Sequence, residues 1–366
     1  MAITRVLWQA FQVPFRRPAD EDGPPAPIRH GLLVRVATDD GRTGLGEASP
    51  VGAGTAGEVA ALAAHLPAAS APLLGAEPDA VSIPLSPAVP APIRFGLATA
   101  VLDLAGRSMH KPMAGVIGGV PRPIPVNILI TARTPAGVRR QVREGLEIGV
   151  TSFKVKVARA SLDEELAVAA AVRGEAGPGA SLRLDANGGW TETEAISILP
   201  RFEPIGIEYV EQPVPPGDAD GMALVRRSVS IPVAADESVV SLAAAVDLAA
   251  REAADLFVVK AARLGFWETI ALLREGTQRG WTMVVTSSLE SGVGLAASLH
   301  LASLLPAGSP ACGLATSGLL ESDLVLDPPS VAGGQMEIPA IPGLGVLLDP
   351  RAVERYAAPP AGAIPG

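Results

Sequence analysis

Lysine is rare in this chain, and its positions suggest acid–base chemistry. The sequence has 29 Lys and Arg residues, but Lys occurs only at positions 111, 154, 156 and 260. Arginine stays protonated in proteins, whereas a lysine held out of water beside another cation can lose its proton and act as a base. Lys154 and Lys156 lie in the alternating pattern of 152–157, which predicts a strand with both side chains on one face. These lysines are therefore candidates for proton transfer.

Three carboxylates and the last lysine follow apolar runs at nearly even spacing. Asp185, Glu211, Asp236 and Lys260 are separated by 26, 25 and 24 residues. Residues at the ends of successive strands of a parallel barrel converge at one rim. Three carboxylates brought together in this way would repel one another unless a cation lay among them, and all-oxygen ligation suits Mg²⁺, or Mn²⁺ in its place. The spacing therefore predicts a divalent metal site formed by the three acids.

The elements that must position these residues alternate between strand and helix from about residue 124. The expected strands are 124–130, 152–157, 181–185, 206–211, 232–236, 255–260, 282–286 and 311–314. Helical patterns between them include 135–148, 162–173, 192–200, 240–253 and 265–279, and a further helix should begin near Gly292. Eight strands connected in this way predict a parallel α/β fold, the (β/α) barrel.

An α+β unit is expected ahead of the barrel. Its predicted elements are a strand over 1–14, a hairpin formed by 31–37 and 44–47, and helices near 56–67 and 94–108. The loops 16–29 and 48–57 are expected to set substrate specificity, and the Pro-rich first loop is expected to close over the occupied site. We therefore divide the chain into a capping domain (1–120), a barrel (121–322) and a C-terminal segment (323–366) that should pack back on the capping domain.

Composition excludes several classes of function. A net charge of −9 without a basic cluster argues against nucleic acid as a partner. No apolar run approaches the roughly 18 residues of a membrane span, and the N-terminus lacks a signal-peptide pattern, so we expect a cytoplasmic protein. The single cysteine, Cys312, excludes an intramolecular disulfide. The expected partner is a small molecule, which the family resemblance given below implies to be a carboxylate, and a homo-oligomer stays open.

Five short motifs carry a resemblance to the enolase superfamily. They are Lys154-Val-Lys156, Asp185-Ala-Asn187, Glu211-Gln-Pro213, Asp236-Glu-Ser238 and Val259-Lys260. Lysines on both the second and the sixth strand are similar to those of the muconate-lactonizing-enzyme subgroup. The resemblance implies an enolase-type modified barrel with a capping domain, and removal of a proton α to a carboxylate through an enediolate intermediate.

The resemblance also implies a role for each site residue. Asp185, Glu211 and Asp236 would be Mg²⁺ ligands, and Lys156 the acid/base. Lys260 would face Lys156 across the substrate. Lys154 would favour the neutral amine of Lys156 through like-charge repulsion.

Residues next to the expected ligands, and one turn, are further candidates. Asn187 and Glu237 are predicted to order contacts around the metal site, although ordinary strand-end hydrogen bonding explains them equally well. The small-residue turn after the seventh strand contains Ser287, Ser288, Leu289 and Glu290. Its backbone N–H groups are predicted to bind a second substrate carboxylate, and an ordinary βα turn is the alternative interpretation.

The segments 285–297 and 312–316 make the chain look like the o-succinylbenzoate synthases. Those enzymes are carbon–oxygen lyases that dehydrate a succinyl-bearing cyclohexadiene carboxylate on the route to menaquinone. N-succinylamino acid racemase and muconate-type cycloisomerase, both isomerases, stay open as alternatives because they use the same lysines and metal. A non-catalytic metal-binding scaffold is a remote alternative, since the intact lysines argue against it.

Overall fold

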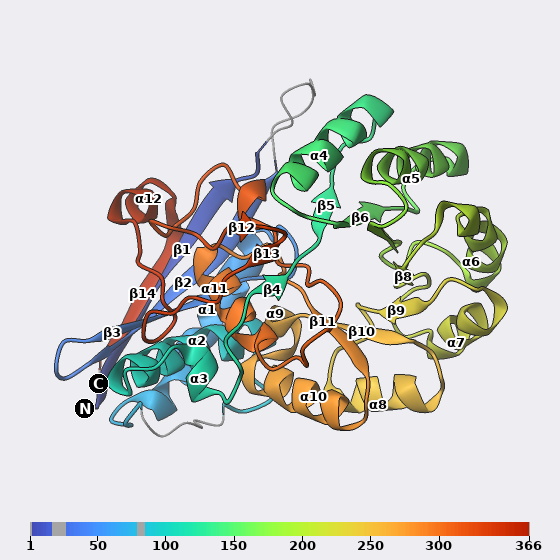
Figure 1. Ribbon diagram of the computed structural model, residues 1–366. Helices are drawn as coiled ribbons and strands as arrows, with labels where there is room; N and C mark the ends of the chain where they lie inside the picture. Colours follow the sequence, from blue (N-terminus) through green and yellow to red (C-terminus); the bar gives the residue numbers. More distant parts are fainter. Residues whose placement is uncertain (1, 17–26, 79–84, 366) are drawn as a thin grey trace.

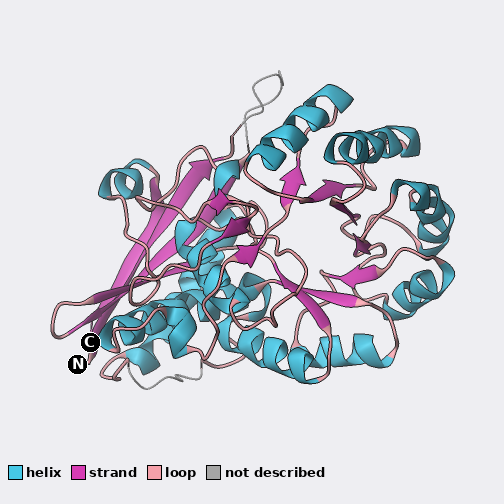
Figure 2. Cartoon of the chain, in the orientation of Figure 1, coloured by secondary structure: helices cyan, strands magenta, loops and turns pink. Residues whose placement is uncertain are grey.

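The computed structural model describes residues 2–16, 27–78 and 85–365. An antiparallel sheet with its helices occupies one side of the molecule, and a curved parallel sheet surrounded by helices occupies the other (Figures 1 and 2). Within these ranges, no helix is long and apolar enough to cross a membrane. The loop expected at 16–29 falls largely on 17–26, which lies outside the described residues.

The N-terminal sheet has four antiparallel strands in the order β14-β1-β2-β3. They are β1 (Ile3–Pro14), β2 (Ile28–Thr38), β3 (Thr43–Ala48) and β14 (Ala357–Pro365). The expected hairpin is formed by β2 and β3. Because β14 pairs with β1, the end of the chain completes the sheet that its beginning starts, and the two termini lie side by side (Figure 1).

Two helices, α1 (Ala56–Ser70) and α2 (Ala91–Ser108), pack on one face of this sheet. Strand β2 alternates between two cores: Leu32 and Val34 pack with these helices, whereas Leu33 packs with the barrel. Strand β3 runs so close to α2 that a Cβ atom on Gly46 would lie 1.9 Å from the carbonyl oxygen of Gly96. Glycine is therefore required where the hairpin meets the helix.

The second half of the molecule is a parallel sheet in the order β11-β10-β9-β8-β7-β6-β5. Its strands are β5 (Ile128–Ile130), β6 (Ser152–Lys156), β7 (Ser181–Asp185), β8 (Tyr209–Glu211), β9 (Val233–Ala235), β10 (Leu256–Val259) and β11 (Thr282–Val285). Most strand residues are buried because helices cover the outer face of the sheet and side chains fill the interior. Together with the family comparisons below, this order confirms the predicted barrel.

Helices follow the strands on the outside of the barrel. They are α4 (Pro135–Glu147), α5 (Leu162–Ala176), α6 (Glu192–Ile198), α7 (Ala219–Ser228), α8 (Leu242–Ala250), α9 (Ala261–Leu264), α10 (Phe266–Gln278) and α11 (Gly292–Ala302). Short helices α3 (Met113–Val116) and α12 (Pro350–Arg355) lie outside this ring. Two barrel helices begin with capping boxes, Ser161 with Glu164 and Thr191 with Glu194, which fix where the chain leaves the strand ends.

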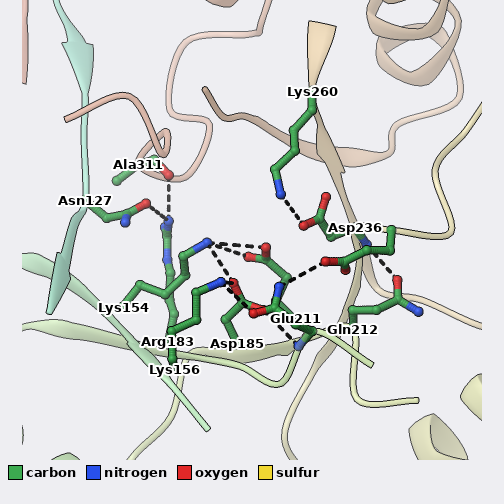
Figure 3. Close-up of polar contacts among 12 residues, drawn as sticks. Asn127, Lys154, Lys156, Arg183, Asp185, Glu211, Gln212, Asp236, Lys260 and Ala311 are labelled. Atoms are coloured by element: carbon green, nitrogen blue, oxygen red, sulfur yellow. Dashed lines mark hydrogen bonds and ion pairs between the residues drawn. The ribbon is translucent and has the colours of Figure 1, made fainter. Parts of the chain in front are cut away.

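The eighth expected strand, 311–314, closes the barrel without being a regular strand. The Cys312 amide donates to the Pro125 carbonyl at 2.7 Å, and the Gly313 amide donates to the Val285 carbonyl at 3.0 Å. Buried Arg183 also donates to Asn127 Oδ1 at 2.9 Å and to the carbonyl of Ala311 at 2.6 Å (Figure 3). This short segment is therefore held by isolated bridges on both sides and by an arginine that crosses the interior.

Two other expected strands are shorter than predicted. Prolines at 123 and 125 lack amide donors, so 124–130 is divided into β4 (Ile124–Pro125) and β5. Strand β4 pairs with β13 (Gln335–Met336), which pairs with β12 (Val331–Ala332). The expected strand 206–211 begins only at Tyr209, because Gly206, with φ 79°, ends a 3₁₀ turn in the left-handed conformation.

Candidate active site

A cavity of about 360 Å³ lies at the carboxyl ends of the barrel strands. Residues that end or follow β6, β7, β9, β10 and β11 line it, and Val51 and Gly52 contribute from the loop after β3. Lys154, Lys156 and Lys260 are all among the lining residues. The structure thus brings together lysines that lie more than 100 positions apart in the sequence.

The three predicted acids also meet at this rim. Asp185 and Glu211 are direct partners across β7 and β8, and Asp236 follows β9 on the next strand. All three side chains are completely or almost completely buried. Burial first, and then the negative charge of Asp185, raise the pKa of Glu211 to about 8. Of the three acids, Glu211 is therefore the one whose negative charge is held at a considerable cost.

Lys154 and Lys156 reach these acids from β6. Lys154 Nζ lies 3.1 Å from Glu211 Oε2 and 3.3 Å from Asp185 Oδ2 (Figure 3). Lys156 Nζ lies 2.6 Å from Asp185 Oδ2. Burial alone would lower the pKa of Lys154, but the charges of Glu211 and Asp185 raise it above its usual value. Lys154 is therefore held as a cation between two carboxylates.

Lys260 approaches from another side, through Asp236. Its Nζ forms an ion pair with Asp236 Oδ2, and Figure 3 shows it pointing down from β10 toward the acids. Arg263 Nη1 donates to Asp236 Oδ1 at 2.7 Å and to its backbone oxygen at 2.6 Å. Burial would raise the pKa of Asp236, but the charges of Lys260 and Arg263 hold it well below its usual range. Sequence reasoning missed Arg263, although its place three residues after Lys260 on α9 was a usable signal.

The donor set fits a hard divalent cation, although the oxygens are now paired with cations of the protein. Across the described ranges, no three His, Cys, Asp or Glu side chains already stand as a metal-binding group. Three buried carboxylates on successive strands are nevertheless oxygen donors of the right type. A bound cation would take the positions that the lysine ammonium groups now occupy.

Asn187 links four side chains of the rim. Its Oδ1 accepts from Lys156 Nζ at 2.7 Å and from Arg159 Nη2 at 3.0 Å. Its Nδ2 donates to Glu237 Oε1 at 2.9 Å, and its backbone amide donates to Asp185 Oδ1 at 3.1 Å. The predicted pair Asn187 and Glu237 is thus connected to Lys156 and to the acids by hydrogen bonds.

Unfavourable backbone conformations gather at the same rim. Six described non-glycine residues have positive φ, and four of them, Ala158, Asn187, Gln212 and Leu289, closely follow β6, β7, β8 and β11. Each such conformation costs roughly 1–2 kcal/mol and persists only where the surroundings enforce it. Gln212 shows how: its Oε1 accepts from the amides of Asp236 and Ser238 at 3.0 and 3.1 Å. The rim is therefore held rigidly.

The turn after β11 is divided between the cavity and the protein interior. Ser287, Ser288 and Leu289 line the cavity, whereas Glu290 is buried and accepts from the Ser288 amide at 2.6 Å. The backbone donors that follow also have internal acceptors. The amides of Ser291 and Gly294 donate to Glu47, and that of Gly292 donates to Asp323. The anion at the N-terminus of α11 is therefore supplied by the chain itself, and binding of a substrate carboxylate by residues 287–290 stays a prediction.

Comparison with known proteins shows the family of the chain. Residues 137–352 match the family described as Enolase C-terminal domain-like. The o-succinylbenzoate synthase of Thermobifida fusca is 41% identical over 216 residues, which cover 57% of this chain and 66% of that protein, just under two thirds. The o-succinylbenzoate synthase of Thermosynechococcus vestitus is 32% identical over 304 residues, covering 81% of this chain and 88% of that one.

Among solved structures, the 2-chloromuconate cycloisomerase from Rhodococcus opacus has a TM-score of 0.87. It is 26% identical, and the match covers 98% of this chain and 100% of that one. The similarity therefore extends over both halves of the molecule, the antiparallel sheet as well as the barrel.

Proposed function

Because the chain belongs to the Enolase C-terminal domain-like family, in which its relatives are lyases and isomerases, we propose that it removes a proton α to a carboxylate. The observation that carries this proposal is the placement of Lys156 and Lys260. They stand at the ends of strands four apart in the sheet, line one cavity, and approach a common group of buried acids.

The charges around the cavity suit this chemistry. A proton α to a carboxylate is weakly acidic, because its removal adds a second negative charge to an anion. Fixed positive groups in a poorly solvated site stabilise that charge better than water does. Lys260 is such a group, since it is nearly buried and anchored by Asp236, and nearly buried Lys154 adds a second positive charge. Lys156, hydrogen-bonded to Asn187, then serves as the base in its neutral form.

A metal completes the proposal. Asp185, Glu211 and Asp236 would hold Mg²⁺, or Mn²⁺ in its place, and the ion would supply positive charge to the carboxylate oxygens of the substrate. Asn187 and Glu237 keep the neighbouring side chains in place through their shared hydrogen bond. Loading the ion would free Lys154 and Lys156 from the oxygens that they now contact.

The specific reaction that we propose is dehydration to o-succinylbenzoate, a precursor of menaquinone. The relative of highest identity named above carries that name. In such a dehydration Lys156 takes the α proton, the C–O bond of the neighbouring carbon breaks, and a new C=C bond forms. The protonated Lys156 then gives its proton to the departing hydroxyl group, which leaves as water, while Lys260 needs only to remain a cation.

Two isomerase reactions are alternatives. The nearly complete overlay with a chloromuconate cycloisomerase favours a muconate-type cycloisomerase. The presence of Lys156 and Lys260 on different strands at one cavity favours N-succinylamino acid racemase, because such an enzyme exchanges protons on both faces of the substrate.

An assay of the purified, Mg²⁺-loaded protein against the three substrate types tests the proposal. We expect turnover of the succinyl-bearing cyclohexadiene carboxylate to exceed that of N-succinyl amino acids and of cis,cis-muconate. Faster conversion of either other substrate would replace the dehydratase assignment by the corresponding isomerase. Absence of turnover of all three substrates, together with absence of α-proton exchange of N-succinyl amino acids with solvent deuterium, would contradict the general proposal.

A further inference from the structure

Arg159 differs from the other basic residues of the cavity. Five basic side chains line it, and four of them (Lys154, Lys156, Lys260 and Arg263) form ion pairs with Asp185, Glu211 or Asp236. Arg159 has no acidic partner anywhere in the described parts of the chain. Its guanidinium is hydrogen-bonded there only through Nη2, to the neutral amide oxygen of Asn187. A guanidinium has five donors, so most of its hydrogen-bonding capacity is unused.

The chain nevertheless holds Arg159 firmly in place. Ala158, with φ 62°, takes a left-handed conformation that turns the chain just after β6. The backbone amides of Arg159 and Ala160 then both donate to Oε1 of buried Glu165, at 2.7 and 3.0 Å. With its backbone fixed by Glu165 and its guanidinium by Asn187, this arginine is ordered without being neutralised.

We propose that Arg159 binds a carboxylate of the substrate that is remote from the carbon losing its proton. The planar guanidinium presents paired donors that match a carboxylate, and Nε and Nη1 have no partner in the described chain. The site has five basic residues and four acids, namely Asp185, Glu211, Asp236 and Glu237. A bound divalent cation would add to this excess of positive charge. The formal charge of the site therefore suits a substrate with two negative charges better than a substrate with one. This inference rests on the proposed function and adds a binding residue to it.

Calorimetric binding of a product-like diacid tests the role of Arg159. The probes are o-succinylbenzoate and its side-chain methyl ester, titrated into Mg²⁺-loaded protein. The variants are Arg159→Met and Arg159→Lys. Arg279→Met is the matched control, because Arg279 follows the last residue of α10, does not line the cavity, and pairs with Glu275 on the surface. Arg159 is itself exposed at the cavity mouth, so its replacement should leave the fold intact.

We expect wild type to bind the diacid about 10- to 100-fold more tightly than the ester, which is the usual value of a charge-assisted pair. Arg159→Met should abolish this preference, because it should lower the affinity for the diacid and leave the affinity for the ester within about twofold of the wild-type value. Arg159→Lys should keep part of the preference, and Arg279→Met all of it. A diacid preference unchanged in Arg159→Met would overturn the inference.

The same titrations separate this inference from the proposed reaction. If wild type does not bind o-succinylbenzoate, N-succinyl amino acids and cis,cis-muconate replace it, because each carries two carboxylates. Tight binding of one of these that Arg159→Met abolishes would support the role of Arg159 and refute the dehydratase assignment. Failure of wild type to bind any of the three diacids would overturn both.

Discussion

The molecule contains two groups of buried charged residues, and they differ in the kind of partner that neutralises their acids. The rim cluster consists of Asp185, Glu211 and Asp236 with Lys154, Lys156, Lys260 and Arg263, and it borders the cavity. The interface cluster consists of Arg29, Glu47, Glu290 and Asp323 around the start of α11. The rim acids are neutralised by side chains, and the interface acids mainly by backbone amides.

The interface cluster joins distant parts of the chain. Glu47 on β3 accepts from Ser291 Oγ at 2.6 Å and from the Gly294 amide at 3.1 Å, both on the barrel side. Asp323 accepts from the Gly292 amide at 2.9 Å. Arg29 lies 3.8 Å from Glu47 and donates to the carbonyl of Pro50 at 2.8 Å. Carboxylates at a helix N-terminus are favoured by the helix dipole, so this cluster fastens the N-terminal sheet to the barrel.

The type of partner decides what each cluster can do. A lysine has four rotatable bonds in its side chain, so Lys154 and Lys156 can leave the rim acids when a metal or substrate takes their place. A backbone amide of α11 cannot move without deforming the helix. We therefore expect changes in the rim cluster to alter activity more than stability, and changes in the interface cluster to do the reverse.

The largest expected effect is the loss of turnover in Lys156→Arg. Arginine keeps the positive charge but cannot become neutral near pH 7, so turnover should fall by about 10³-fold or more. Lys111→Arg is the matched control, because Lys111 is exposed and does not line the cavity. Steady-state kinetics measure the effect, and robust dehydration by Lys156→Arg would remove Lys156 from the mechanism.

Lys260→Arg separates a dehydratase from a racemase. A dehydratase needs only a cation at this position, so the variant should retain measurable formation of o-succinylbenzoate. A racemase needs a proton carrier there, so the same change should stop racemisation and the exchange of one enantiomer with solvent deuterium. If Lys260→Arg loses both activities, the result does not separate the two reactions, because arginine is also larger than lysine. A variant with a shorter cationic side chain at position 260 must then be compared.

The next largest expected effect is a loss of metal-dependent activity when Glu211 is replaced. Glu211→Gln keeps a hydrogen-bond acceptor for Lys154 but removes the charge, so activity and Mg²⁺ affinity should fall by about 10²-fold or more. The free energy of unfolding without metal should change little, because burial already disfavours the charged form of Glu211, whose pKa is raised to about 8, and because Lys154 keeps Asp185 as an ion-pair partner at 3.3 Å. Glu275→Gln on the surface of α10 is the control. Full turnover after exhaustive chelation would contradict the metal assignment.

The sequence was sufficient for the periodic features of the molecule. Acids and a lysine about one strand–helix unit apart identified the rim, and the order of motifs identified the family that the comparisons confirm. Arg159 could not be assigned, because its place depends on the left-handed turn at Ala158, which alanine rarely adopts. Glu47 could not be assigned either, since its partner Ser291 is 244 residues away. The catalytic and metal-binding roles stay predictions for the experiments above.

A smaller effect, on stability, is expected for Glu47→Gln in the interface cluster. The change leaves Arg29 buried without its nearest carboxylate partner, which should lower the free energy of unfolding by about 3–4 kcal/mol. The folded variant should keep kcat within a few fold. Urea denaturation and kinetics on the same preparation measure both, with exposed Glu58→Gln as the control. A hundredfold loss of kcat at unchanged stability would contradict the comparison, because the interface cluster would then affect activity rather than stability.

The smallest expected effect is a change in how stability depends on pH, caused by Asp323→Asn. Burial raises the pKa of Asp323 to about 6 from an ordinary value of 3.8. Between these values the unfolded chain has released the proton while the folded protein still holds it. Stability from this group is therefore fully present below about pH 4 and is lost as the pH rises through 6, by up to about 3 kcal/mol. Asparagine still accepts from Gly292 but does not titrate. Urea titrations should therefore show that the unfolding free energy of the variant minus that of wild type rises between pH 4 and pH 7. Parallel pH profiles of the two proteins would refute the assigned role of Asp323.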